Sequence, residues 1–222
     1  LHHKILVVPM YHPVAAAPRY NPGLATVMVE DWRRLGELLA GVPKPELGRY
    51  IGASTSYALA LLAAGGVVAL DFETTDPRWR GTFQAVRARP IGVSVAVREG
   101  EAVYVEETDI GFLRAVLEDP TVAKVAHNAV FEYIIARGCG ITIRNLHCTK
   151  LMAAVLRTSS THLKRLTWQE LGVEQTRYED VDWTDLAAVV QYGSADSDLA
   201  LRLFNRLRDR LVDEGLWELY EM

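Results

Sequence analysis

The sequence predicts an α/β domain in which a mixed central sheet is flanked by helices. Half of the 222 residues are apolar, which is enough to build a substantial core. Residues 67–70 form a continuous apolar run, as expected of a buried strand, whereas residues 185–213 carry apolar positions at helical spacing. Early strands followed by interleaved strands and helices indicate a layered α/β architecture.

The first 45 residues are predicted to form an appendage that ends in a linker. Proline and glycine interrupt any regular element over residues 41–48. We therefore expect an appendage over residues 1–45 and a main domain over residues 46–222.

The main domain is predicted to begin with a short helix that leads into the strand at residues 67–70. The expected elements are a helix over 55–64, strands near 90–98 and 101–106, a helix near 109–118, a strand running into a helix over 123–137, and helices near 149–157, 162–171 and 185–213. The longest nearly apolar stretch, residues 57–70, is interrupted by two glycines and is too short for a bilayer, so no membrane partner is expected.

Asp71 and Glu73 lie two residues apart at the end of this predicted strand. Side chains alternate across a strand, so both carboxylates point to the same face and lie close together. Burying two like charges side by side is costly unless a cation neutralises them. The pair therefore predicts a metal site.

Two further acidic elements occur later in the chain. Tyr192 and Asp196 are four residues apart and share one face of a predicted helix. Glu132 lies on the helix that follows a short strand near residue 124. Carboxylate oxygens suit hard cations, so these elements favour Mg²⁺ or Mn²⁺ as the bound ion.

Three motifs combine these residues in a fixed order: Asp-x-Glu at 71–73, His-Asn-x-x-Phe-Glu at 127–132 and Tyr-x-x-x-Asp at 192–196. They resemble the exonuclease motifs of the DEDD superfamily, tyrosine subtype, and above all those of the 3′–5′ proofreading domain of DNA polymerase I-type enzymes. The resemblance covers residues 65–222 and implies an RNase H-like (DEDD exonuclease) fold. It also implies metal-dependent hydrolysis of single-stranded or frayed DNA 3′ ends to nucleoside monophosphates.

The resemblance assigns a role to each matching residue. Two divalent cations, Mg²⁺ or Mn²⁺, would be held by Asp71, Glu73, Glu132 and Asp196. Tyr192 would orient the attacking water, because its hydroxyl can donate or accept a hydrogen bond. The terminal nucleotides would be contacted by Thr74, Asn128 and Phe131.

The chain departs from the family pattern at Glu132, where aspartate is usual. The charge is kept, but the carboxylate sits one methylene farther from its backbone. We expect activity to be retained; the alternative is a loosely held second cation and a slow enzyme. Among neighbouring residues, His127 is expected to be structural, Trp183 to be a packing residue, and Asp198 to face away from the site.

Two other functions remain open at this point. RNase D-like enzymes share the tyrosine subtype and digest RNA, and one sequence does not show how a 2′-hydroxyl would be treated. A catalytically weakened nucleic-acid-binding module is the other alternative, although such modules normally lack several carboxylates. Here only the position of Glu132 is altered.

The net charge of −4 argues against a broad basic surface for duplex DNA, but not against a grip on a few nucleotides of single strand. The basic residues that could line such a channel, or equally form solvated helix faces, are Lys150, Arg157, Lys164 and Arg165. The two cysteines are too few for a disulfide framework and are expected to be reduced thiols in a cytoplasmic protein.

Both ends of the chain carry weaker resemblances. Tyr11-His12-Pro13 and the Asn-Pro-x-Leu turn at 21–24 resemble the C-terminal end of family 4 uracil-DNA glycosylases. This resemblance implies a strand over residues 4–10 and a final helix over residues 30–39; the alternative is an ordinary β-α appendage. No base-excision activity is expected from this segment. Residues 215–222 resemble the junction at which polymerase I-type chains enter the polymerase, so a covalently linked polymerase domain is expected after this chain.

Overall fold

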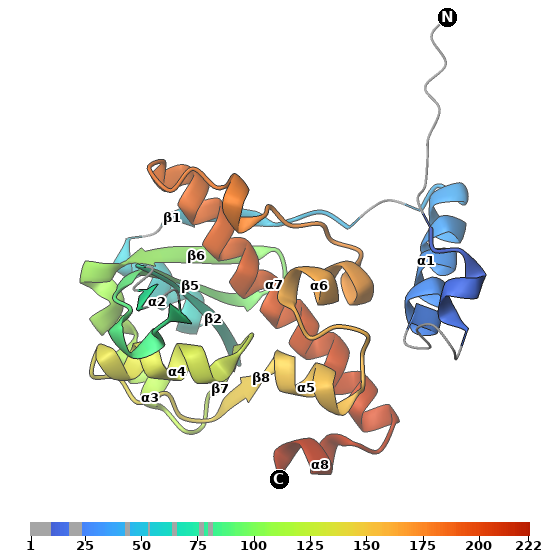
Figure 1. Ribbon diagram of the computed structural model, residues 1–222. Coiled ribbons are helices and arrows are strands. Elements are labelled where there is room, and N and C mark those ends of the chain that lie inside the picture. Colours follow the sequence, from blue (N-terminus) through green and yellow to red (C-terminus); the bar gives the residue numbers. More distant parts are fainter. Residues whose placement is uncertain are drawn as a thin grey trace, which may run out of the picture. The chain divides into compact units, whose positions relative to one another are not determined.

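The computed structural model describes residues 10–17, 24–42, 45–52, 54–63, 66–75, 78–79 and 82–222 (Figure 1). It divides into two compact units, Leu1–Pro45 and Glu46–Met222. The boundary between them falls within the linker-like stretch of residues 41–48.

The first unit contains a short 3₁₀ helix, η1 (Pro13–Ala16), and the helix α1 (Leu24–Leu39). His12 precedes η1, and its Nδ1 accepts a hydrogen bond from the Val14 N–H at 3.2 Å. α1 begins six residues before the predicted residue 30, because Leu24 and Met28 continue the apolar spacing toward the N-terminus. The strand expected over residues 4–10 lies outside the described residues except for Met10.

The second unit is built on a six-stranded sheet with the strand order β1-β6-β5-β2-β7-β8. The strands are β1 (Arg49–Gly52), β2 (Val67–Thr74), β5 (Pro90–Arg98), β6 (Glu101–Glu106), β7 (Ala123–Ala126) and β8 (Leu146–Cys148). The β2–β5 and β5–β6 pairs are antiparallel, and the other three pairs are parallel. The sheet is therefore mixed, which confirms the predicted fold class.

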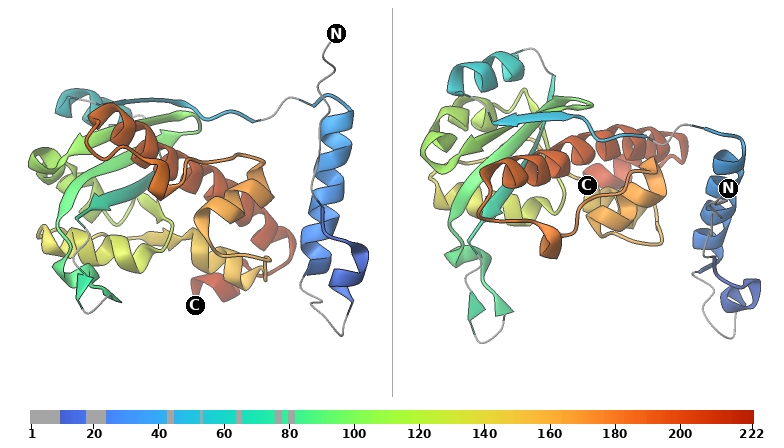
Figure 2. Two further views of the ribbon diagram at one scale, coloured as in Figure 1. Left: turned by 45° about the horizontal axis from the view of Figure 1, so that its top comes forward. Right: turned by 90° about the horizontal axis from the view of Figure 1, so that it is seen from above.

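Helices cover both faces of this sheet (Figures 1 and 2). One face packs against α2 (Thr55–Ala63), α3 (Arg114–Glu118) and α4 (Ala129–Gly138), and the other packs against α5 (Thr149–Val155), α6 (Leu163–Leu171) and α7 (Leu186–Asp213). The long helix α7 crosses β5, β2, β6 and β1. It thereby brings residues near the C-terminus of the chain onto the central strand.

Alternate residues of β2 belong to two different cores. Val68 and Leu70 pack into the core shared with α2 and α4, whereas Ala69 packs into the core beneath α7. Asp71 and Glu73 continue the Ala69 series, because side chains alternate along a strand. The pleat of β2 therefore directs both carboxylates toward α7.

Small residues allow α7 to lie close to the sheet. A Cβ atom on Gly193 would come within 3.1 Å of Glu73 Oε1, which is tighter than an ordinary contact. Ser94 of β5 donates a hydrogen bond to the Gly193 carbonyl at 2.7 Å and so ties helix to sheet. Asp185 caps the start of α7, because its side chain accepts a hydrogen bond from the Ala187 N–H at 2.9 Å.

Several short elements were not predicted from the sequence. The helix expected near 109–118 is a 3₁₀ segment, η3 (Glu107–Leu113), that continues into α3. The elements without a prediction are β1, β8, the hairpin of β3 (Arg78–Trp79) and β4 (Thr82–Phe83), η2 (Ala85–Arg87), η4 (Tyr178–Asp180) and α8 (Trp217–Glu221). They contain too few residues to establish a recognisable apolar period.

Within the described ranges, no helix has both the length and the apolar character needed to cross a bilayer.

Candidate active site

Three carboxylates converge where β2 passes beneath α7. One oxygen atom from each of Asp71, Glu73 and Asp196 lies within 4.8 Å of the others. Glu73 and Asp196 are buried, whereas Asp71 retains partial exposure. The alternation of β2 supplies the first two carboxylates, and the crossing of α7 supplies the third. The result is a compact set of hard oxygen donors.

Glu132 lies near this group, but its carboxylate contacts the backbone of β2. It extends from α4 with an exposed fraction of only 1%, and its Oε2 accepts a hydrogen bond from the Phe72 N–H at 2.9 Å. Its charge nevertheless acts on Asp71: after burial, Glu132 is the strongest cause of the raised pKa of Asp71. The structure therefore places the fourth predicted carboxylate close to Asp71 and outside the three-carboxylate group.

Burial raises the pKa values of all four carboxyl groups, and repulsion from neighbouring carboxylates adds to this effect for Asp71, Glu73 and Glu132. Burial, followed by the charge of Asp196, raises the pKa of Glu73 to about 8. Burial raises the pKa of Asp196 to about 7, against the opposing effects of Lys164 and a side-chain hydrogen bond. The pKa values of Asp71 and Glu132 are also raised well above their usual range, mainly by burial. A divalent cation would favour the ionised form of every one of these groups.

The donor atoms of the group fit such a cation. Glu73 Oε1 is buried and accepts no hydrogen bond within the described part of the chain. Buried oxygen atoms almost always have a hydrogen-bond partner, so this exception calls for an explanation. An unpartnered carboxylate oxygen beside two further carboxylates is suited to bind a hard divalent ion such as Mg²⁺ or Mn²⁺.

Tyr192 lies one turn before Asp196 on α7 and presents its hydroxyl next to the carboxylate group. Its hydroxyl oxygen accepts a hydrogen bond from Lys164 Nζ at 3.2 Å. Burial, followed by the charge of Asp196, raises the pKa of Tyr192 well above its usual range, so the phenol stays neutral. The ring packs edge-on against Trp183 at a centroid distance of 5.6 Å. Trp183 thus packs beside the site, as predicted.

Gln175 is a neighbour of the site that the sequence did not reveal. It lies in the loop between α6 and α7, and its Nε2 donates a hydrogen bond to Asp196 Oδ1 at 2.7 Å. Its Oε1 accepts a hydrogen bond from the Thr167 hydroxyl at 3.2 Å, which fixes the orientation of the amide. Gln175 therefore restrains one oxygen of Asp196. No pattern in the sequence singles out this glutamine, because its role depends on how the loop folds over α7.

The three residues with a predicted nucleotide contact occupy the carboxyl-terminal edge of the parallel pair β2–β7. Thr74 is the last residue of β2, and Asn128 follows β7 directly before α4. Asn128 has a left-handed backbone with φ of 73°, and its Oδ1 accepts a hydrogen bond from Lys150 Nζ at 3.3 Å. Phe131 is half-buried on the first turn of α4 and packs against the core on that side of the sheet.

His127 is a structural residue, as its position in the motif suggested. Its Nε2 lies 3.0 Å from the carbonyl of Thr161, which can only accept a hydrogen bond. Nε2 therefore carries the proton, and Nδ1 accepts a hydrogen bond from the Thr149 hydroxyl at 2.9 Å. Burial lowers the pKa of His127 to about 4, which keeps the ring neutral. The histidine joins β7 to the segments around α5 and takes no part in the carboxylate group.

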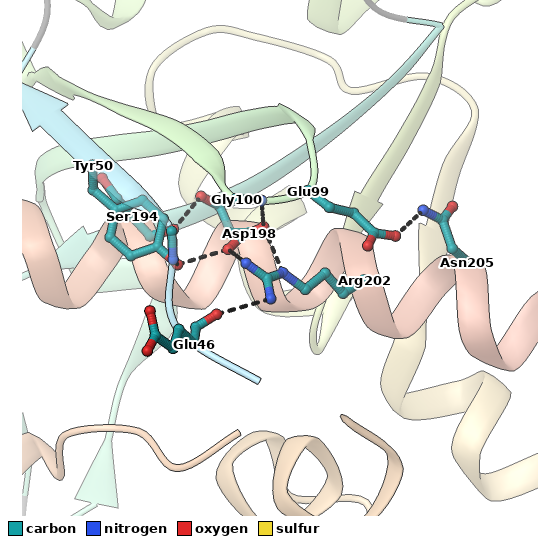
Figure 3. A network of polar contacts seen from close by, with 10 residues as sticks. Glu46, Tyr50, Glu99, Gly100, Ser194, Asp198, Arg202 and Asn205 are labelled. Carbon is teal, nitrogen blue, oxygen red and sulfur yellow. Dashed lines mark hydrogen bonds and ion pairs between the residues drawn. The ribbon is translucent and has the colours of Figure 1, made fainter. Parts of the chain in front are cut away.

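Asp198 faces away from the three carboxylates, as predicted, but it is fully buried in a network of its own (Figure 3). It accepts hydrogen bonds from the Tyr50 hydroxyl at 2.6 Å and from the Gly100 N–H at 2.8 Å. Arg202, one turn later on α7, donates to both of its carboxylate oxygens at 3.1 and 2.7 Å. Arg202 also donates to the carbonyl of Glu46 at 3.2 Å. The network fastens β1 and the β5–β6 turn to the helix that carries the catalytic candidates.

The chain matches a known protein family and known proteins. Residues 53–212 match the family described as 3′–5′ exonuclease. DNA polymerase I of Rhizobium leguminosarum is 28% identical over 201 residues, which cover 71% of this chain and 19% of that protein. The chain therefore spans about a fifth of the length of this curated relative.

Solved structures resemble the chain at lower identity. The POL domain of Pol1 from M. smegmatis, solved with DNA primer-template and dNTP, has a TM-score of 0.62 and 20% identity, covering 78% of this chain and 29% of that chain. Escherichia coli RNase D, an exoribonuclease involved in structured RNA processing, has a TM-score of 0.61 and 19% identity, covering 75% of this chain and 46% of that chain. At these identities the likeness shows the fold alone, and it confirms the expected RNase H-like architecture.

Proposed function

This chain belongs to the 3′–5′ exonuclease family, and we propose that it removes nucleotides from the 3′ end of single-stranded or frayed DNA. The observation that carries the proposal is the convergence of Asp71, Glu73 and Asp196 around the unpartnered Glu73 Oε1. This arrangement supports metal-assisted hydrolysis, because it offers hard oxygen donors in a buried position.

The proposed reaction is hydrolysis of the last phosphodiester bond. The oxygen of a water molecule bonds to phosphorus and releases a proton, while the bond between phosphorus and the 3′ oxygen breaks and that oxygen takes up a proton. The products are a nucleoside 5′-monophosphate and a strand shortened by one nucleotide with a free 3′-hydroxyl. The site would hold two divalent cations, whose chemistry would be to activate the water and to stabilise the departing oxygen.

Each carboxylate has a role in this proposal. Asp71, Glu73 and Asp196 would hold one cation, and Asp71 would also reach a second. Glu132 would support the second ion directly or through water. The Glu132 carboxylate accepts a hydrogen bond from the Phe72 N–H, which anchors it beside Asp71. This contact supports retention of activity with glutamate at this position.

The chain's neutral residues would place the substrate. Tyr192 would orient the attacking water by donating a hydrogen bond to it, since the raised pKa of the phenol keeps its hydroxyl protonated. Contacts with the terminal nucleotides are assigned to Thr74, Asn128 and Phe131, at the edge where β2 and β7 end. Phe131 would contribute an apolar or stacking contact that tolerates any base.

DNA is the proposed substrate because the similar full-length proteins include DNA polymerase I of Rhizobium leguminosarum. That relative is several times longer than this chain, which supports a covalently linked polymerase domain and a proofreading role. An RNA exonuclease is the second candidate, and it is favoured by the structural likeness to RNase D.

Digestion of matched DNA and RNA oligonucleotides, labelled at the 5′ end, tests the proposal. We expect a ladder of DNA products that shorten from the 3′ end when Mg²⁺ or Mn²⁺ is present and none when EDTA replaces the metal. Asp71→Asn and Asp196→Asn should each lower the rate on the order of a hundredfold or more. Asp209→Asn is the matched control, because Asp209 is an exposed carboxylate on the same helix as Asp196.

The outcomes are distinct. Faster digestion of RNA than of DNA would replace the proposed substrate with the second candidate. Unchanged digestion by Asp71→Asn and Asp196→Asn would refute the assignment of the site. Calorimetric titration with Mn²⁺ adds an independent check, since a degenerate site would show no binding that depends on these carboxylates.

A further inference from the structure

Lys164 is a cation at the edge of the carboxylate group for which the motifs assign no role. It extends from α6, and its Nζ donates hydrogen bonds to the Thr176 carbonyl at 2.6 Å and to the Tyr192 hydroxyl at 3.2 Å. The ammonium also lies 4.6 Å from the centroid of the Tyr192 ring. Three contacts with two residues of different segments therefore fix its position beside the site.

The partners of Lys164 are neutral, although carboxylates are near. Within the described part of the chain, no carboxylate oxygen lies within the 4.0 Å of its ammonium that would make an ion pair. Its charge nevertheless lowers the pKa values of Asp71, Glu73 and Asp196 against the effect of burial. The ammonium is thus close enough to act on all three groups but is not neutralised by direct contact with any of them.

This arrangement suits the binding of an anion. An ammonium group has three N–H donors, and the structure accounts for two of them. Cations bound by the three carboxylates would draw the phosphate of a 3′-terminal nucleotide into the same space. A positively charged donor fixed next to that space by a main-chain carbonyl and a phenol loses little side-chain entropy when it meets a phosphate oxygen.

We propose that Lys164 is a substrate-contacting residue of this site and that its ammonium binds a non-bridging oxygen of the phosphate that is hydrolysed. The inference rests on the exonuclease function proposed above. It has a consequence for Tyr192: the hydroxyl oxygen accepts the Lys164 hydrogen bond, so the phenol proton is directed away from the lysine. Tyr192 is then a hydrogen-bond donor to the attacking water and does not act as a base.

Lys164→Met removes the charge and keeps the length of the side chain. We expect kcat/KM on a single-stranded DNA oligonucleotide to fall between about tenfold and a hundredfold, the usual range for one charge-assisted hydrogen bond. Lys164→Arg keeps the charge and should restore part of the loss. Arg144→Met is the matched control, because Arg144 is an exposed cation outside the site.

Salt dependence separates a phosphate contact from a structural effect. At constant metal concentration, the logarithm of kcat/KM should fall linearly with the logarithm of salt concentration. The slope of this line is proportional to the number of phosphate contacts. Lys164→Met should reduce this slope by about 0.7, the contribution of one contact to a single strand. Arg144→Met should leave the slope unchanged.

The results discriminate between the two proposals. If the wild-type enzyme is active and Lys164→Met has the same salt slope and nearly the same kcat/KM, the proposed role of Lys164 is overturned. The exonuclease proposal would then still stand. A lower kcat with an unchanged slope would also overturn it, because the lysine would then act only through Tyr192. A wild-type protein without metal-dependent digestion would overturn the exonuclease proposal itself.

Discussion

Removal of the Asp198 carboxylate tests how α7 is held on the sheet. In Asp198→Ala, the guanidinium of Arg202 loses its ion pair while its side chain stays largely buried, with an exposed fraction of 15%. The Gly100 N–H and the Tyr50 hydroxyl lose their acceptor in the same change. Breaking a buried pair on one side typically costs about 3–5 kcal/mol, because the remaining charge is uncompensated.

The lower end of this range applies to Asp198. Arg202 still donates to the Glu46 carbonyl and retains some contact with water, which moderates the cost. We therefore expect the free energy of unfolding to fall by about 3 kcal/mol, equivalent to a melting temperature lower by about 6–12 °C for a chain of this size. Thermal and urea denaturation followed by circular dichroism would measure both quantities.

Two further variants make the test specific. Arg202→Met in the Asp198→Ala background removes the stranded charge, so the double variant should be more stable than the sum of the two single effects predicts. Asp209→Ala is the matched control on the same helix; its side chain is 71% exposed, and the melting curve should barely change. A loss below about 1 kcal/mol in Asp198→Ala, or strict additivity in the double variant, would refute the reasoning.

Two other predictions concern the carboxylates themselves. The folded protein without metal keeps protons on Glu73 and Asp196 up to pKa values of about 8 and 7, whereas unfolded carboxyl groups release theirs near their ordinary values of 4.5 and 3.8. The folded state thus binds more protons in this window, so the melting temperature measured in EDTA should fall as the pH rises from about 4 to 8. Saturating Mn²⁺ should flatten this trend. A melting temperature that rises with pH in EDTA would contradict the assignment. Glu132→Asp should retain exonuclease activity, and its free energy of unfolding should fall by about 1 kcal/mol, because the shorter side chain withdraws from the Phe72 N–H. Digestion assays measure the activity and denaturation measures the stability. A complete loss of activity would show that the site requires the longer glutamate side chain.

The sequence alone determined the parts of this protein that depend on local periodicity. The continuous apolar run of β2, the alternation that puts Asp71 and Glu73 on one face, and the turn that separates Tyr192 from Asp196 are all properties of a single strand or helix. Their order along the chain also sufficed to identify the exonuclease family, which the match over residues 53–212 shows.

Only the tertiary structure decided which distant groups meet. Gln175 restrains Asp196 because a loop folds over α7, and Lys164 reaches Tyr192 because α6 packs beside that helix. Asp198 looked like an uninvolved helix residue, yet it joins α7 to β1 and to the β5–β6 turn. Hydrogen bonds and ion pairs between remote segments leave no periodic trace in a sequence, since each depends on how separate elements pack and not on the spacing within one of them.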